Sequence, residues 1–155
     1  HSTISAPYVY EACGGGNVSP ELRWSGAPAG TMAYAITVYD PDAPTGSGWW
    51  HWLAYNIPAV VSQLPRGAGN TGSAPLPSGA AQGINDYSQR GYGGPCPPPG
   101  SSPHHYIFTV FALKVARLEL PANASCALIG FNLNANMLAK ASFTATYSRP
   151  AQTAR

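Results

Sequence analysis

Hydrophobic positions gather in four segments that are separated by turns rich in proline and glycine. Residues 31–40 (TMAYAITVYD) are apolar, β-branched or aromatic and end at an Asp-Pro turn, which is typical of a buried strand. Residues 50–58 (WHWLAYNIP) repeat this pattern, residues 105–115 (HYIFTVFALKV) show it most clearly, and residues 142–148 (SFTATYS) show it more weakly. The four segments predict a largely antiparallel sheet structure.

Side chains in residues 50–58 are expected to alternate between the two faces of the sheet. The alternation gives two sets, one formed by His51, Leu53 and Tyr55 and the other by Trp50, Trp52, Ala54 and Asn56. On this pattern His51 and Trp52 lie on opposite faces.

A helical period replaces the strand pattern near the C-terminus. Leu128, Phe131, Ala135 and Leu138 recur at spacings of three and four residues, and Ser125 is a suitable N-cap. We therefore predict one helix over about residues 125–139 that packs against the sheet through this apolar face.

The segment between Pro65 and Pro103 has no sustained period and is rich in glycine and proline. A loop of this length inside a compact domain is usually functional or disordered. Its residues Asp86, Tyr87 and Tyr92 favour partial docking of the loop against the body of the protein.

The composition fits one domain over residues 1–155 and excludes several classes of function. Charged residues make up 9% of the chain, against about 25% in an average globular protein. The net charge is only +2 and no basic stripe is present, so nucleic acid is not an expected partner. The apolar runs are far shorter than the roughly 20 residues that cross a bilayer, so no transmembrane segment is expected.

The three cysteines differ in their surroundings. Cys13 and Cys96 lie in loops rich in glycine and proline, where a bridge is geometrically feasible, whereas Cys126 lies in the apolar helical pattern. We predict a Cys13–Cys96 disulfide formed in an oxidising compartment and a buried thiol at Cys126. The alternative, with all three cysteines reduced, stays open. The chain starts at His1 without a methionine, which agrees with an upstream segment such as a signal peptide.

Polar residues stand where the predicted strands meet loops. Asp40 and Asp42 follow the first strand, His51 lies in the second, and His104 and Tyr106 lie at the start of the third. Because consecutive antiparallel strands bring such ends together, Asp40, His51, His104 and Tyr106 are candidates for one pocket. A carboxylate beside an imidazole favours the protonated ring, so the pocket would suit phosphate, sulfate or a carboxylate. In the alternative interpretation, His51 is a core histidine and Asp40 caps a turn.

Two further kinds of site remain as weaker alternatives. Two aspartates and two histidines are legitimate ligands for zinc, but they lack the tight spacing of a typical zinc motif. A nucleophilic hydrolase would need an activated serine. Ser47 and Ser88 lie in flexible contexts without a Gly-x-Ser-x-Gly turn. No metal or cofactor is therefore expected.

Four motifs occur together in order: DPDAP at 40–44, WWHW at 49–52, GPCPPPG at 94–100 and HHYIFTVFAL at 104–113. Together they resemble the phosphatidylethanolamine-binding protein family, and in particular its bacterial branch, often described as Raf-kinase-inhibitor-like. The likeness covers nearly the whole chain. It implies an antiparallel β-sandwich with Greek-key strands and a C-terminal helix.

The resemblance also implies which residues bind ligand. The pocket would consist of Asp40, His51, His104 and Tyr106, with walls and support from Asp42, Pro44, Trp49, Gly94 and Pro95. Trp49 is expected at the rim, and Trp50 and Trp52 are expected to serve packing. Many eukaryotic members have an arginine inside the H-x-Y motif, where this chain has His105.

We therefore expect a non-enzymatic protein that binds a small anion, such as phosphate, a phospholipid head group or a carboxylate. One alternative is a protein–protein regulator that inhibits a kinase or a protease, although the short and nearly uncharged loops weaken that expectation. Another alternative is an enzyme that uses His51 or His104 as a proton donor. The resemblance to exported bacterial members favours a periplasmic or secreted location, with the cytoplasm as the alternative.

Overall fold

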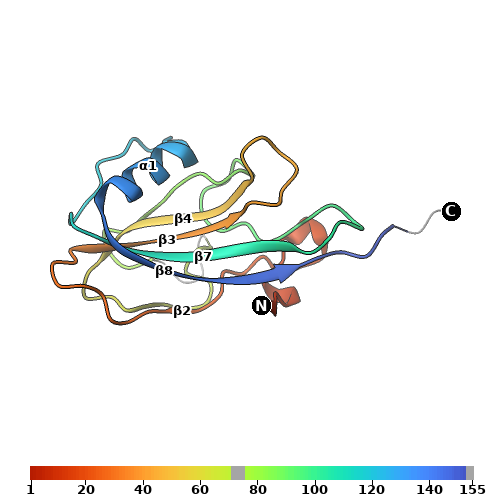
Figure 1. Cartoon of the computed structure of the whole chain (residues 1–155), viewed down its shortest axis with the longest axis horizontal. Helices are drawn as coiled ribbons and strands as arrows, with labels where there is room; N and C mark the ends of the chain where they lie inside the picture. The colour runs from red at the N-terminus through yellow and green to blue at the C-terminus, as the bar shows by residue number, and fades with distance from the viewer. Residues whose placement is uncertain (71–75, 153–155) are drawn as a thin grey trace.

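A six-stranded mixed sheet forms the body of the protein (Figure 1). A computed structural model describes residues 1–70 and 76–152, and its main sheet has the strand order β1-β8-β7-β3-β4-β6. The long strands run antiparallel to their neighbours and are β3 (Ala33–Asp40), β4 (Trp49–Pro58), β7 (His104–Leu113) and β8 (Met137–Tyr147). At the edges, β1 (Ser2–Thr3) pairs parallel with β8, and β6 (Ala81–Gln82) pairs antiparallel with β4. The mainly β fold class predicted from the sequence is confirmed.

Smaller elements cover the two faces of this sheet. Strands β2 (Leu22–Arg23) and β5 (Gln63–Leu64) pair into a second sheet on one side, and the helix α1 (Cys126–Asn136) lies on the other side (Figure 1). Two short 3-10 helices, η1 (Ala6–Tyr8) and η2 (Glu11–Cys13), follow β1. The main sheet is therefore the middle layer, with apolar side chains buried on both of its faces.

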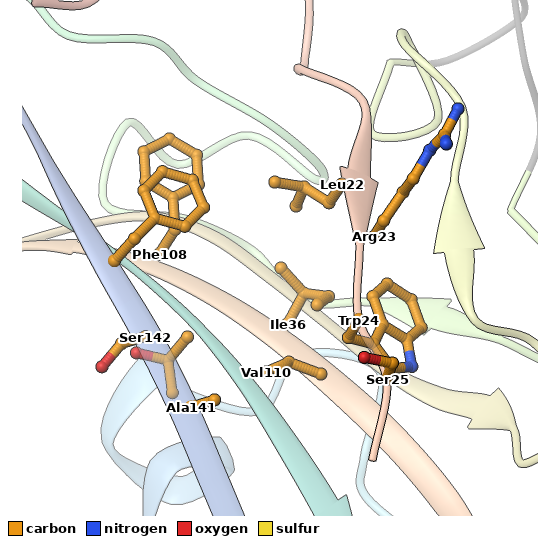
Figure 2. A pocket seen from close by; sticks show the side chains of 11 residues that line it. Leu22, Arg23, Trp24, Ser25, Ile36, Phe108, Val110, Ala141 and Ser142 are labelled. Carbon is orange, nitrogen blue, oxygen red and sulfur yellow. The ribbon is translucent and has the colours of Figure 1, made fainter. Parts of the chain in front are cut away.

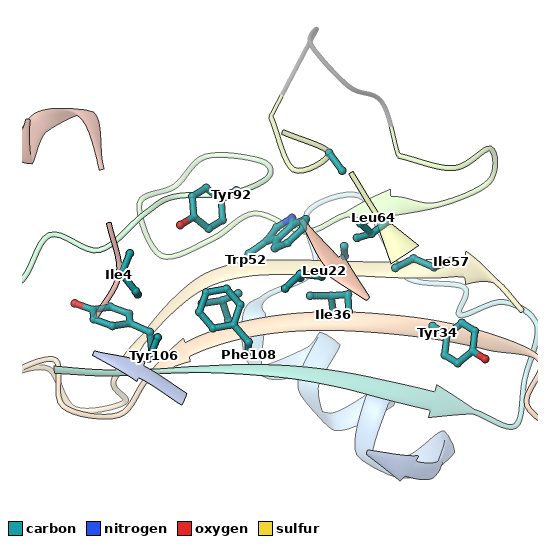
Figure 3. Close-up of a cluster of buried hydrophobic side chains, with 14 of the residues drawn as sticks. Ile4, Leu22, Tyr34, Ile36, Trp52, Ile57, Leu64, Tyr92, Tyr106 and Phe108 are labelled. Atoms are coloured by element: carbon teal, nitrogen blue, oxygen red, sulfur yellow. The ribbon is translucent and has the colours of Figure 1, made fainter. Parts of the chain in front are cut away.

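Each face of the main sheet has its own hydrophobic cluster. The cluster on the side of β2 and β5 includes Ile36, Trp52 and Phe108 (Figure 3). The cluster on the side of α1 includes Leu53 and Leu113. Because both faces of the central strands are covered, these strands are almost continuously apolar in sequence rather than strictly alternating.

The predicted packing face of the helix is wrong. Ile129 and Leu133 are completely buried against the sheet, whereas Phe131 is 71% exposed and Leu128 is 39% exposed. Apolar residues occur on more than one side of this helix, so its period alone did not identify the face in contact with the sheet. The Ser125 hydroxyl accepts a hydrogen bond from the Leu128 N–H and caps the helix, as predicted.

The helix also ends earlier than predicted. It stops at Asn136, and β8 begins at the next residue instead of near residue 142. The ladder between β7 and β8 starts at the pair Leu113–Met137 and continues to the pair His104–Tyr147. The backbone pairing along this ladder outweighs the helix propensity of residues 138–140. No helix within the described residues has the length and apolar character needed to span a membrane.

Most of the predicted loop between residues 65 and 103 lies against the body of the protein. The Asp86 N–H donates to the Trp50 carbonyl at 2.9 Å, and the Tyr92 hydroxyl donates to the Tyr8 carbonyl at 2.6 Å. Residues 71–75 of this segment lie outside the described part of the chain. The docked part brings residues 87–98 to the ends of the central strands.

Candidate functional site

A β-bulge at the start of β4 determines the position of His51. Val38 on β3 pairs with Trp52, and Tyr39 pairs with Trp50, so His51 has no partner on β3. An extra residue of this kind interrupts the alternation of side chains. His51 therefore lies near Tyr106, on the Trp52 side of the sheet, and Trp50 packs toward the cluster under α1. The predicted alternation, with His51 and Trp52 on opposite faces, is wrong at this point.

A cavity of about 370 Å³ lies where the ends of β3, β4 and β7 meet. The lining includes the polar residues singled out from the sequence, namely Asp40, His51, His104 and Tyr106, together with Pro44 and Trp49. The other lining residues are Tyr10, Ala43, Thr45, Tyr87, Cys96, Pro97 and Pro98. The structure thus brings the four polar residues together, while their role in binding stays a prediction.

Asp40 and His104 form a buried pair at this cavity. The Asp40 Oδ2 atom lies 2.7 Å from the His104 Nδ1 atom, and both side chains are at least nine-tenths buried. The other carboxylate oxygen of Asp40 accepts a hydrogen bond from the Asp42 N–H at 2.7 Å. With Nδ1 engaged by Asp40, the His104 ring is fixed in orientation and its Nε2 atom is the nitrogen available to a ligand.

His51 differs from His104 in its ring partner. Its Nδ1 atom lies 2.7 Å from the Gly93 carbonyl, so Nδ1–H donates to this oxygen. Burial lowers the pKa of His51 to about 4, although the Gly93 carbonyl and the Asp40 carboxylate act in the opposite direction. His51 is therefore neutral near pH 7, and its Nε2 atom accepts hydrogen bonds.

Two hydrogen-bond donors at the cavity lack a partner. Among the described residues, the Tyr106 hydroxyl and the Trp49 indole nitrogen are buried without a hydrogen bond. The Tyr106 ring lies 5.2 Å from the His51 ring and 6.5 Å from the His104 ring, measured between centroids. Burial raises the pKa of Tyr106, which keeps its hydroxyl protonated. An unsatisfied buried donor costs about 1–3 kcal/mol, so these two donors suit a ligand that accepts hydrogen bonds.

Asp42 supports the turn without lining the cavity. Its Oδ2 atom accepts hydrogen bonds from the backbone N–H and from Nδ1 of His105, each at 2.7 Å. Burial acts to raise the pKa of Asp42, but the hydrogen bonds and positive charge of His105 outweigh it and lower the pKa. His105, the residue inside the H-x-Y motif, is thus engaged by Asp42 on the exposed side of the strand.

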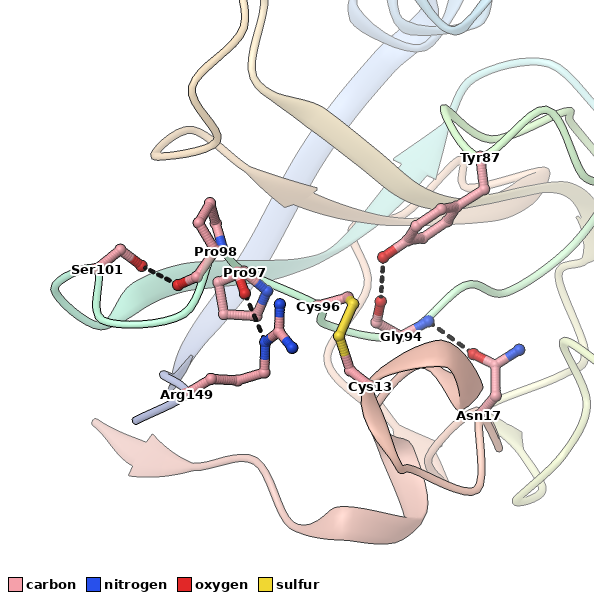
Figure 4. Close-up of a disulfide and its surroundings, with 9 residues drawn as sticks. All are labelled: Cys13, Asn17, Tyr87, Gly94, Cys96, Pro97, Pro98, Ser101 and Arg149. Carbon is pink, nitrogen blue, oxygen red and sulfur yellow. Dashed lines mark hydrogen bonds between the residues drawn. A yellow bond between two sulfur atoms is a disulfide. The ribbon is translucent and has the colours of Figure 1, made fainter. Parts of the chain in front are cut away.

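Gly94 and Pro95 also lie behind the lining residues. The Gly94 carbonyl accepts from the Tyr87 hydroxyl at 2.7 Å, and its N–H donates to Asn17 Oδ1 at 2.8 Å (Figure 4). A Cβ atom at Gly94 would collide with the Tyr8 carbonyl, which explains the need for glycine. The Pro95 carbonyl accepts from the Tyr10 N–H at 3.0 Å. Both residues fix the wall of the cavity through the backbone.

Tyr10 and Tyr87 line the cavity, although neither residue was expected to bind ligand. Their rings stack with centroids 4.0 Å apart, and Tyr87 also meets Trp49 and His51 edge to face. Tyr87 was expected only to help dock its loop, and Tyr10 lies in the segment PYVYE, where nothing distinguishes it from Tyr8. These rings, with Pro97 and Pro98, make much of the wall apolar.

A disulfide joins Cys13 to Cys96 beside the cavity (Figure 4). The two Cα atoms lie 5.6 Å apart, and Cys96 itself lines the cavity. The following residue, Pro97, accepts a hydrogen bond from Arg149 Nε at 2.7 Å. Cys126 is free and half-buried, and burial raises the pKa of its thiol to about 12. Cys126 is therefore not a reactive thiolate near neutral pH.

The two weaker alternatives find little support at this cavity. Within residues 1–70 and 76–152, no group of three or more His, Cys, Asp or Glu side chains is placed to hold a metal ion. Neither Ser47 nor Ser88 is among the residues that line the cavity. Its chemistry therefore rests on the Asp40–His104 pair, the neutral His51 and the two unpaired donors.

The fold and the site define a mixed-sheet protein whose central strands end at a small cavity that contains a few buried polar side chains. Residues 2–148 match the family model described as phosphatidylethanolamine-binding protein, and the chain belongs to this family, as the sequence motifs predicted. The chain is 56% identical over 145 residues to YbcL of Escherichia coli (strain K12). The aligned region covers 94% of this chain and 79% of YbcL. It is 47% identical over 143 residues to YbhB of the same organism, and this aligned region covers 91% of the chain and 89% of YbhB.

A solved structure supports the same assignment. The crystal structure of E. coli YbcL, described as a new member of the mammalian PEBP family, superposes with a TM-score of 0.92 at 52% sequence identity. The match covers 95% of this chain and 91% of the YbcL chain. The arrangement of the strands around the cavity is thus that of a known family fold.

Proposed function

We propose that the protein binds a small phosphorylated anion in the cavity at the ends of β3, β4 and β7. The ligand is inorganic phosphate or a phosphoryl head group, such as that of a phospholipid. One observation carries the proposal: two buried donors without partners, Tyr106 Oη and Trp49 Nε1, belong to the same cavity as the ring that Asp40 orients.

The polar groups complement a singly protonated phosphate. Asp40 engages Nδ1 of His104, which leaves Nε2 for a charge-assisted hydrogen bond to the anion. Tyr106 and Trp49 add two neutral donors. The neutral His51 accepts through Nε2 from the P–OH group of a hydrogen phosphate or a singly protonated phosphate monoester. A phospholipid is a phosphodiester without this P–OH group and would use the donors alone. The site therefore matches both the acceptors and the proton of a hydrogen phosphate or a monoester.

The walls make these contacts stronger and limit the size of the ligand. Tyr10, Tyr87, Pro44 and Pro97 surround the polar groups with apolar surface, which excludes water and lowers the local dielectric constant. A volume of about 370 Å³ suits a head group, with any acyl chains remaining outside. Because a structural disulfide requires an oxidising compartment, Cys13–Cys96 supports a periplasmic or secreted location.

Removal of one hydroxyl group tests the proposal. Tyr106→Phe is expected to weaken phosphate binding about tenfold or more in isothermal titration calorimetry, because a hydrogen bond to a charged group is lost. The fold should be preserved, since this hydroxyl has no partner in the protein.

Tyr55→Phe is the matched control because Tyr55 is a buried strand residue that does not line the cavity. The control should bind phosphate as the wild type does. Equal affinity of the wild type and both variants would contradict the proposal. Parallel titrations with phosphate and phosphoethanolamine identify which source of the phosphoryl group is preferred.

A further inference from the structure

Strand β8 is an edge strand over most of its length. One side pairs with β7 throughout, and among the described strands the other side pairs only with β1, at Ala145 and Thr146. The backbone groups of residues 137–144 that face away from β7 therefore have no strand partner in the described sheet. Residues 138–143 are all exposed. Natural proteins commonly protect such an edge with charges or proline, but β8 has one charged residue, Lys140, and no proline.

Three apolar hollows lie along the inner side of this edge, and we call them together the β8 furrow. The first, of about 140 Å³, includes Ala139 and Ala141 in its lining. The second, of about 220 Å³, includes Ala141 and Phe143, and the third, of about 160 Å³, includes Phe143 and Ala145. Neighbouring hollows share lining residues and therefore follow one another in a row along the edge.

The opposite wall of the furrow comes from β2 and the residues beside it. Figure 2 shows Leu22 and Trp24 facing Ile36, Phe108 and Val110 across the middle hollow. Phe143 stacks on Phe108 with ring centroids 4.8 Å apart and remains 53% exposed. Large apolar side chains thus line the furrow. Leu22, Ile36 and Phe108 are themselves buried, whereas Phe143 is exposed beside an edge that no strand of the described residues covers.

The spacing of the hollows matches the period of an extended chain. Successive hollows advance by two residues along β8, and a strand directs every second side chain to the same face, about 6.6 Å apart. A strand added beside β8 would therefore direct side chains i, i+2 and i+4 into the three hollows. The edge already accepts a strand at its end, where the Ile4 N–H donates to the Thr146 carbonyl at 2.8 Å.

We propose that the free edge of β8 binds an extended segment of a partner protein. The segment adds to the main sheet as a further strand, and apolar side chains at alternate positions fill the β8 furrow. The backbone hydrogen bonds of β8 give affinity, and the three hollows select the alternating pattern. The β8 furrow shares no lining residue with the anion cavity, so this inference is independent of the proposed function.

A synthetic peptide provides a direct probe. A blocked, fluorescein-labelled peptide of about nine residues, with three valines at alternate positions among threonines and lysines, is titrated with the full chain by fluorescence anisotropy. Saturable binding is expected. An isomer with the three valines adjacent, and a copy with N-methylated backbone amides, should each bind at least about tenfold more weakly, because one loses the pattern and the other loses backbone donors.

Two variants locate the binding site. Ala141→Glu introduces a carboxylate at a residue that borders two hollows, and it should weaken binding of the alternating peptide at least about tenfold. Leu138→Glu is the matched control, since Leu138 is an exposed residue of the same strand that borders no hollow. The melting temperature and phosphate affinity of both variants should match the wild type.

Several results would overturn the inference. The first is equal binding of the alternating and adjacent isomers, or no binding of either at millimolar concentration. The second is equal peptide affinity of the Ala141→Glu and Leu138→Glu variants. The third is absence of peptide binding together with a concentration-dependent dimer of the wild type that Ala141→Glu disrupts. This result would assign the edge to a second copy of the chain.

Discussion

Reduction of the Cys13–Cys96 disulfide is expected to lower the free energy of unfolding by about 4 kcal/mol. The bridge joins residues 83 positions apart, and closing a loop of this length removes much conformational entropy from the unfolded chain. It also ties η2 to Cys96, which lines the anion cavity. Reduction should therefore weaken phosphate binding as well as stability.

Chemical denaturation with and without a reducing agent measures this effect. The wild type should lose about 4 kcal/mol in reductant, whereas a Cys13→Ser/Cys96→Ser variant should have the lower stability in both conditions. Cys126 remains free in both proteins and so controls for effects of the reductant on this thiol. An unchanged unfolding midpoint of the wild type in reductant would contradict the structural role given to the bridge.

Acidification is expected to destabilise the protein through His51. Burial lowers the pKa of His51 to about 4 in the folded state, against 6.5 for an ordinary histidine. Between these values the unfolded chain binds a proton that the folded chain does not, so the free energy of unfolding falls as the pH falls from about 6.5 to about 4. The full loss from this one group is about 3 kcal/mol.

A glutamine at this position isolates the contribution of His51. Unfolding free energies are compared at pH 7 and pH 4.5 for the wild type, His51→Gln, and His1→Gln as an exposed control. The free energy of unfolding should decrease less between pH 7 and pH 4.5 in His51→Gln than in the wild type, by about 2–3 kcal/mol. The decrease in His1→Gln should equal that of the wild type. The same decrease in all three proteins would show that other groups dominate the acid response.

Much of the candidate site was predictable because simple rules govern the ends of antiparallel strands. Asp40 ends one buried strand and His104 begins another, so their meeting required only that these strands be neighbours, as they are in the sheet. The DPDAP turn and the H-x-Y motif also belong to a recognisable family, which the comparisons confirm. Strands β3, β4 and β7 could be identified because their apolar and β-branched character is continuous. Only the second half of β8 was predicted, because its exposed residues 138–141 lack this pattern.

Other features depend on contacts that a sequence pattern does not contain. The bulge at His51 reverses the expected face of two residues, and it becomes visible only in the pairing with β3. Ile129 and Leu133 form the packed face of α1 because of where the sheet lies, although Phe131 is equally apolar. Tyr10 and Tyr87 reach the cavity through the docking of irregular segments, and local propensity does not predict such docking.

The most direct test of anion binding in the cavity follows the histidine ring signals by NMR during titration with phosphate. We expect saturable shifts of His51 and His104, with little change for His1 and His105, which do not line the cavity. We also expect bound phosphate to raise the pKa of His51 above about 4. Unchanged His51 and His104 signals at saturating phosphate, with the fold intact, would contradict the proposed site.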